Sequence, residues 1–223
     1  MKLSITKKQM LKKFDFLLKT YFPENHTKYL KKKSFLKAFD IAYDRIDFCF
    51  SRIKTKYYNE GKNFTFNHLN TDHMCVFFYF WYNSGYREKL NDKFLTQLFY
   101  LNKILHSIDI FYTVELPDIV LLVHPLGTVI GKAKFDNYLV IYQNVTIGAT
   151  RESKELLYPK FGKNVIFYSN SSVIGDCKVG NNVTFGANAN IVNKDIKDNK
   201  IVFGSFPKNR IINNNNIKKI YFQ

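Results

Sequence analysis

One histidine, His124, lies in a stretch of the chain that carries a repeating apolar pattern, within Leu-Val-His-Pro-Leu-Gly. Activation of a hydroxyl nucleophile needs a base with a pKa near neutrality, and histidine supplies one. Such a base is usually oriented by a carboxylate at its other ring nitrogen. Asp109 lies fifteen residues before His124, close to one coil of a hexapeptide β-helix, so we expect the two to meet. This pair predicts general-base catalysis on a hydroxyl group.

A period of six residues organises the second half of the chain. Between residues 161 and 196 every sixth residue is large and apolar: Phe161, Phe167, Val173, Val179, Phe185 and Ile191. This period suits neither an α-helix nor a plain strand, and it is the repeat of a parallel β-helix with about 18 residues per coil. An antiparallel sandwich with chance spacing is the alternative.

The same period continues upstream in a different phase. The residues expected to point inward there are Val123, Val129, Phe135, Ile141 and Ile147. Ile147 and Phe161 are fourteen residues apart where a continuous repeat needs twelve, so residues 150–160 are expected to leave the coil as a loop. Because His124 follows an inward residue, its side chain is expected to face outward.

The first half of the chain is expected to be helical. Apolar periodicity predicts helices at 6–20, 28–54, 71–84 and 86–106, with a polar loop at 58–70. Thr71 is expected to cap the third helix and Gly85 to end it. The expected fold class is α+β, with a helical domain at 1–107, a parallel β-helix at 108–211 and a tail at 212–223.

Composition limits the possible functions. The net charge is +16, and residues 1–60 hold 15 basic and 6 acidic residues, a net of +9. No nucleic-acid-binding motif accompanies this charge, so a solvated helical face is the simpler interpretation than a nucleic-acid binder. Three scattered cysteines show no disulfide or metal spacing, and one histidine in the repeats is too few for a zinc site. No signal peptide or bilayer-spanning apolar run is evident, so we expect a cytoplasmic protein without a metal.

Three segments resemble the serine acetyltransferases, hexapeptide-repeat enzymes with a helical N-terminal domain: Ser107–Ile110, His124–Gly131 and Val145–Thr150. The resemblance covers roughly residues 70–210 and includes the Asp-to-His spacing. It implies a left-handed coil, acetyl-CoA as the donor, and an active site between the subunits of a homotrimer. Four apolar residues expected to face outward fit such a subunit interface: Val140, Tyr142, Ile166 and Tyr168.

The resemblance also implies residue roles. His124 becomes the general base and Asp109 its partner. Small residues along the coil are expected beside the acetyl-CoA arm, where backbone N–H groups can bond a developing oxyanion: Gly148, Ala149, Ser169 and Ala187. Two cations past the coil are expected to meet the nucleotide phosphates: Lys208 and Arg210. Asp72 and His73 lie where the helical domain of the family reaches the acceptor pocket, and are expected to contact the acceptor.

Two departures from the family bear on the acceptor. The family has an Asp directly before its catalytic His, where this chain has Val123, and an Arg-His pair in the loop, where this chain has Leu157–Tyr158. The missing groups are those expected to hold free serine, whereas Tyr158 offers the aromatic face and hydroxyl typical of a sugar site. The expected activity is therefore acetyl-CoA-dependent O-acetylation of a sugar hydroxyl in cell-surface polysaccharide biosynthesis. The alternatives are a serine O-acetyltransferase of cysteine biosynthesis and an inactive β-helix scaffold.

Overall fold

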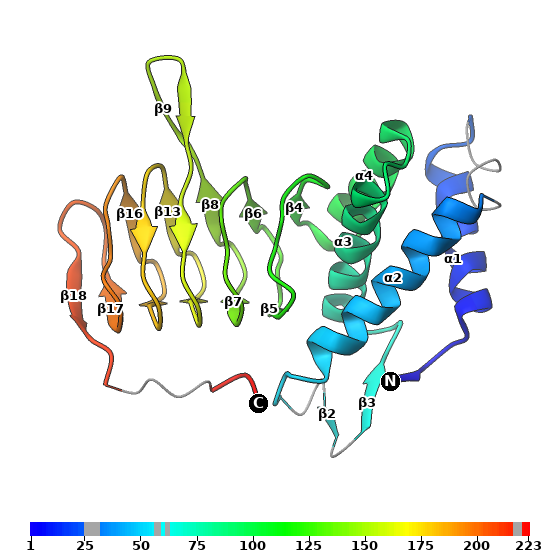
Figure 1. Ribbon diagram of the computed structural model, residues 1–223, viewed down its shortest axis with the longest axis horizontal. Coiled ribbons are helices and arrows are strands. Elements are labelled where there is room, and N and C mark those ends of the chain that lie inside the picture. The colour runs from blue at the N-terminus through cyan, green and yellow to red at the C-terminus, as the bar shows by residue number, and fades with distance from the viewer. Residues whose placement is uncertain (25–31, 56–58, 61–62, 216–219) are drawn as a thin grey trace.

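The computed structural model describes residues 1–24, 32–55, 59–60, 63–215 and 220–223. Figure 1 shows α-helices at one end of the molecule and a row of stacked coils at the other. The helices of the described residues are α1 (Lys7–Tyr21), α2 (Lys33–Phe50), α3 (Thr71–Arg87) and α4 (Asp92–His106). None of the helices in these residues is long and apolar enough to cross a membrane.

Helix α3 is the centre of the helical end, because its residues from His73 to Gly85 are all buried. Trp81 is fully buried, with its ring centroid 4.6 Å from that of Phe14 on α1 and 5.0 Å from that of Phe35 on α2. Burying large aromatic rings removes much apolar surface from water, which is the main contribution to the stability of this end.

Three of the predicted helix ends are wrong. Helix α2 ends at Phe50 and not at Lys54. Helix α3 continues past Gly85 to Arg87, and α4 begins at Asp92, after the N-cap Asn91. A Cβ atom on Gly85 would lie 2.7 Å from Leu95 Cδ2, so this glycine allows α3 and α4 to pack closely and is not a helix terminator. The predicted start of the second helix, at Lys28, lies outside the described residues.

The predicted loop at 58–70 contains strands. Strands β1 (Lys2–Leu3), β2 (Asn59–Glu60) and β3 (Asn63–Phe66) form a small sheet in the order β1-β3-β2. Phe64 and Phe66 are buried against the helices. Their spacing of two residues is the strand signal that the polar composition of this segment obscured.

The coils form a parallel β-helix with three faces. One face has the strands β5 (Val120–Leu122), β7 (Leu139–Ile141), β12 (Ile166–Phe167), β15 (Thr184–Phe185) and β17 (Lys200–Phe203). A second has β4 (Asp109–Ile110), β6 (Val129–Ile130), β8 (Thr146–Gly148), β13 (Ser172–Ile174) and β16 (Asn190–Val192). The third has β11 (Lys160–Phe161) and β14 (Lys178–Val179). Antiparallel β18 (Arg210–Asn213) pairs with β17 and closes the last coil.

The period of six is confirmed downstream and in part upstream, where the predicted inward residues Ile141 and Ile147 are fully buried. The six predicted inward residues from Phe161 to Ile191 are all 5% exposed or less. Upstream, Ile130 is the buried residue, at 2% exposed, whereas the predicted Val129 is 43% exposed. Ile130 pairs with Ile147, seventeen residues on, so this coil is one residue shorter than 18. A one-residue change of register moves every side chain to the other face.

Asparagines form the corners of the coils. Seven of them adopt left-handed backbone angles, with φ between 45° and 61°: Asn144, Asn164, Asn170, Asn182, Asn188, Asn193 and Asn199. Asparagine tolerates this conformation better than most residues. The amide of Asn164 donates to Asn182 at 3.0 Å, and that of Asn182 donates to Asn199 at 2.8 Å. The high asparagine content of the coil therefore has a structural cause.

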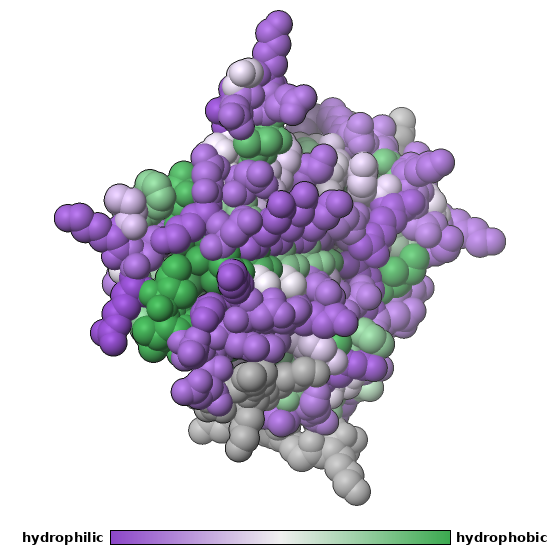
Figure 2. Space-filling view, turned by 60° about the vertical axis from the view of Figure 1, so that its left-hand side comes forward, coloured by the Kyte–Doolittle hydropathy of each residue, from purple (hydrophilic) through white to green (hydrophobic). Residues whose placement is uncertain are grey.

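The predicted excursion loop is confirmed as a hairpin. Strands β9 (Thr150–Glu152) and β10 (Glu155–Leu157) pair antiparallel and project from the coils in Figure 1. Figure 2, in which the last coils come forward, shows a largely hydrophilic face whose largest apolar patch lies at the lower left. Phe203 on β17 and Ile212 on β18 are among the exposed apolar residues of the last coil.

The outward face that was expected to need a partner is largely covered within the chain. Val140 is fully buried and Ile166 is 5% exposed. Tyr142 and Tyr168 are half-buried and hydrogen-bond to Tyr221 of the C-terminal segment. The apolar character of these four residues therefore gives no argument for a trimer.

Candidate active site

His124 lies at a corner of the first complete coil, directly after β5. Its φ is +46°, a left-handed conformation that is uncommon for a residue with a side chain. Two hydrogen bonds hold this turn: His124 N donates to Asp72 Oδ2 at 3.1 Å, and Leu126 N donates to His124 O at 2.7 Å. The imidazole is 76% exposed, so the prediction that it faces outward is confirmed.

Asp72, on the first turn of α3, is the carboxylate that the structure places beside His124. Asn70 caps α3 by accepting from the backbone N–H groups of Asp72 and His73. The N-terminal turn of a helix favours a negative charge. Asp72 Oδ2 lies 3.7 Å from His124 Nδ1, longer than a hydrogen bond but near enough for charge interaction. Burial raises the pKa of Asp72, and the His124 backbone N–H and charge oppose this rise.

Asp109 does not pair with His124, which corrects the sequence prediction. Asp109 Oδ2 lies 2.6 Å from Lys103 Nζ, and its backbone on β4 pairs with Val129 on β6. Within the described parts of the chain, no hydrogen bond or ion pair joins Asp109 to His124. The spacing of fifteen residues brings the backbone of Asp109 beside Thr128, whose carbonyl accepts from Asp109 N at 2.9 Å, but the Asp109 carboxylate pairs with Lys103.

A cleft of about 750 Å³ opens between the start of α3 and the outer face of the first coils. Asp72 and His124 line it together with Tyr142 and Tyr221, and none of its lining residues within the described chain is a lysine or arginine. The remaining lining residues are Thr55, Asn67, Leu69, Asn70, Thr71, Leu121 and Val123. Tyr142 and Tyr221 were missed as site residues, and no motif in the sequence marks the C-terminal segment as part of a site.

Two predicted acceptor contacts lie elsewhere. His73 is 1% exposed, stacks on Phe66 and lies beside Phe50, so in this structure it is a core residue without access to an acceptor. Its side chain points into the helical end because it follows Asp72 by one position on α3. Tyr158 lies after the β9–β10 hairpin, with Lys132 Nζ 5.6 Å from its ring centroid, and does not line this cleft.

The six predicted cofactor contacts fall at three places. Ser169 follows β12 and Ala187 follows β15, at the same corner of successive coils that His124 occupies after β5. This corner is open, because Ser169 is half-buried and Ala187 is exposed. Gly148 and Ala149 lie at the next corner, where the β9–β10 hairpin leaves the coil. Lys208 and Arg210 are exposed and lie beyond the last coil.

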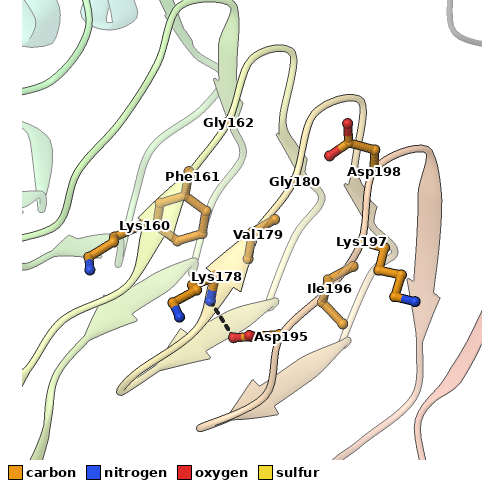
Figure 3. A pocket seen from close by; sticks show the side chains of 10 residues that line it. All are labelled: Lys160, Phe161, Gly162, Lys178, Val179, Gly180, Asp195, Ile196, Lys197 and Asp198. Carbon is orange, nitrogen blue, oxygen red and sulfur yellow. Dashed lines mark hydrogen bonds between the residues drawn. The ribbon is translucent and has the colours of Figure 1, made fainter.

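A second hollow of about 490 Å³ lies on the third face of the coils, shown in Figure 3. The side chains of Phe161, Val179 and Ile196 line it, together with three lysines and two aspartates: Lys160, Lys178, Lys197, Asp195 and Asp198. The Asp195 carboxylate accepts a hydrogen bond from Lys178 N at 2.8 Å, so it is committed to linking neighbouring coils. None of its lining residues is a histidine, cysteine or serine.

The cleft at His124 therefore has the groups for base catalysis on a hydroxyl. An exposed imidazole is held at the mouth by its backbone, and a half-buried carboxylate lies beside it to stabilise a positive charge. In the residues that the structure describes, no group of three or more His, Cys, Asp or Glu side chains is arranged to hold a metal ion.

Comparison with known proteins agrees with this architecture. Residues 158–193 match the bacterial transferase hexapeptide family of six repeats. A serine acetyltransferase of Staphylococcus epidermidis is 35% identical over 57 residues, which cover 25% of this chain and 27% of that protein. The match thus spans about a quarter of the length of this relative.

Solved structures extend the similarity to nearly the whole chain. A serine acetyltransferase in complex with cysteine superposes with a TM-score of 0.65 at 16% identity, covering 95% of this chain and 94% of the other. The serine acetyltransferase of Neisseria gonorrhoeae gives 0.62 at 14% identity, covering 92% and 89%. The chain thus has a helical N-terminal end followed by a coil that contains hexapeptide repeats. Its fold is that of the serine acetyltransferases, with the left-handed parallel β-helix that the sequence led us to expect.

Proposed function

We propose that the protein is an acetyl-CoA-dependent O-acetyltransferase of the serine acetyltransferase type. The observation that carries this proposal is the imidazole of His124, held at the cleft by its left-handed turn and by the Asp72 carboxylate. The hexapeptide repeats and the fold support it.

In the proposed reaction, acetyl-CoA supplies the acetyl group as an activated thioester. His124 takes the proton of the acceptor hydroxyl as its oxygen attacks the acetyl carbon, and then gives that proton to the leaving thiolate. A carbon–oxygen bond forms and the carbon–sulfur bond breaks. Asp72 favours the imidazolium that exists between these steps. The open corner at Ser169 and Ala187, on the same edge of the coils as His124, is where we expect the donor to lie.

Similarity favours L-serine as the acceptor over the sugar that the sequence suggested. Both the matching relative and the superposed structures carry the name serine acetyltransferase. The carboxylate of Asp72 is suited to the ammonium group of an amino acid. The homotrimer that the resemblance implies remains a proposal as well, and a neighbouring subunit would be the source of a cation for the serine carboxylate.

A sugar hydroxyl is the second candidate acceptor, and the lining of the cleft favours it. The described lining residues supply no cation for a carboxylate, but they include two tyrosines and several amide and hydroxyl groups. The volume of about 750 Å³ also suits a ligand much larger than serine.

A single experiment tests both acceptors. Release of free thiol from acetyl-CoA is measured with purified protein and L-serine, and in parallel with a panel of monosaccharides and short oligosaccharides. We expect thiol release that depends on the acceptor and yields an O-acetyl ester detectable by mass spectrometry. Thiol release at the rate of the acceptor-free control with every compound would contradict the proposal.

A further inference from the structure

The C-terminal segment Ile220–Gln223 connects the coils to the helical end. Lys54 N donates to Tyr221 O at 2.8 Å, and Gln223 N donates to Arg52 O at 2.8 Å. Phe222 forms an antiparallel bridge with Ile53 and is only 1% exposed. Ordering the backbone of each residue costs about 1–2 kcal/mol, so these contacts are needed to hold the segment in place. In Figure 1 the C-terminus lies between the coils and the end of α2.

Tyr221 links this segment to the coil surface through three hydroxyl groups. Its hydroxyl oxygen lies 2.9 Å from that of Tyr142 and 3.3 Å from that of Tyr168. Burial raises the pKa of Tyr221 well above its ordinary value, so the phenol stays protonated. Three tyrosines carry three O–H donors, and the two hydrogen bonds use two of them. Among the described residues one of these three donors is therefore left without an acceptor, and two of the three tyrosines, Tyr142 and Tyr221, line the cleft.

This cluster forms one side of the cleft that contains the proposed base. Tyr221 and Tyr142 line the cleft from the coil side, and Asp72 lines it from the start of α3. Since Tyr221 is 79 residues from Tyr142 in sequence, its position depends on the docking of the C-terminal segment. The cleft is thus incomplete without the last four residues of the chain.

We infer that the C-terminal segment completes the acceptor-binding site, and that Tyr221 contacts the acceptor. This inference rests on the proposed acetyl transfer at His124. The chemistry of the cluster, an aromatic face beside a free O–H donor, takes an acceptor that has an apolar face and an oxygen that accepts a hydrogen bond. Tyr221 is a binding residue in this account and takes no part in proton transfer.

Thiol release from acetyl-CoA is measured for the wild type, Tyr221→Ala, Tyr221→Phe and Ile220→Ala, with L-serine and with N-acetylglucosamine as acceptors. Ile220 is the matched control, because it is in the same segment but is 56% exposed and does not line the cleft. Tyr221→Ala is expected to raise KM for the acceptor that the wild type uses by about tenfold. KM for acetyl-CoA and all constants of Ile220→Ala are expected to stay within twofold.

Tyr221→Phe distinguishes contact through the hydroxyl group from contact through the ring. Its KM for the acceptor is expected to lie between those of the wild type and Tyr221→Ala. An acceptor KM in Tyr221→Ala within twofold of the wild type, with an unchanged melting curve, would overturn the inference and leave the proposed function standing.

If the wild type releases no thiol with either acceptor, the proposed acetyl transfer to these two compounds is wrong. Contact between Tyr221 and the acceptor is then tested by a binding measurement. Saturation-transfer NMR with the same two compounds is expected to give a signal in the wild type that Tyr221→Ala loses and Ile220→Ala keeps. No signal in the wild type, or an equal signal in Tyr221→Ala, would overturn the inference.

Discussion

Replacing Asp72 by asparagine separates two roles of its carboxylate at His124. In the wild-type protein Asp72 Oδ2 accepts the His124 backbone N–H at 3.1 Å and lies 3.7 Å from Nδ1 of the ring. An asparagine oxygen can still accept the backbone N–H, so the left-handed turn at His124 should persist. The negative charge beside the imidazole is lost.

The free energy lost with the charge of Asp72 follows from the distance between its carboxylate and the His124 ring. Two unit charges 3.7 Å apart attract by about 1 kcal/mol in bulk water and by about 4 kcal/mol at an effective dielectric constant of 20. The His124 side chain is 76% exposed, so the value near that of water applies, and we expect about 1–2 kcal/mol. Asp72→Asn should therefore lower kcat by about tenfold, because the charge acts only on the imidazolium formed during the reaction.

The assay is steady-state thiol release from acetyl-CoA at a saturating concentration of the acceptor. The matched control is Asp109→Asn, since Asp109 pairs with Lys103 and not with His124, and its kcat should stay within about threefold of the wild type. Asp72→Ala should lose more activity than Asp72→Asn because it also releases the His124 backbone N–H. The reasoning is refuted if Asp72→Asn keeps the wild-type kcat, or if Asp109→Asn loses more activity than Asp72→Asn.

Two further predictions concern stability. Burial lowers the pKa of His106 from 6.5 to about 4, so the unfolded chain binds this proton more readily than the folded protein. The stabilising contribution of neutral His106 is present above pH 6.5 and is lost as the pH falls toward 4. The free energy of unfolding by urea should therefore fall by about 2 kcal/mol from pH 7 to pH 5 through this group, and His106→Gln should lack that part of the fall. At the coil corner, Asn182→Gly should lose only the two hydrogen bonds of the Asn182 side chain. Asn182→Ala should be less stable than Asn182→Gly by about 1 kcal/mol, because residue 182 has a left-handed backbone conformation that alanine disfavours. Equal unfolding midpoints for the two Asn182 variants would contradict this explanation of the corners.

The coil was predictable because one local rule repeats along it. From Phe161 to Ile191 the large residue of each six points inward, and simple counting finds it. Upstream the coils have other lengths: Leu122 pairs with Ile141, nineteen residues on, and Ile130 with Ile147, seventeen residues on. Counting in sixes cannot detect such changes, because each of them is decided by the geometry of a corner.

The candidate site was predictable only in part. His124 was singled out because it is the histidine of the repeats and lies in a segment that resembles the serine acetyltransferases, and its outward direction is confirmed. Its carboxylate partner was not found, since Asp72 comes from a helix 52 residues earlier and reaches His124 only when the helical end packs on the coils. Tyr221 depends in the same way on the docking of the C-terminal segment. Contacts between distant segments leave no periodic pattern in the sequence.

The most direct test of the account is the turnover of His124→Ala. If His124 takes the proton of the acceptor hydroxyl, this variant should release thiol from acetyl-CoA about 10²–10⁴ times more slowly than the wild type with the same acceptor. Its melting curve should stay close to that of the wild type, because the imidazole is 76% exposed. A folded His124→Ala that keeps near wild-type turnover would contradict the central claim that His124 is the base.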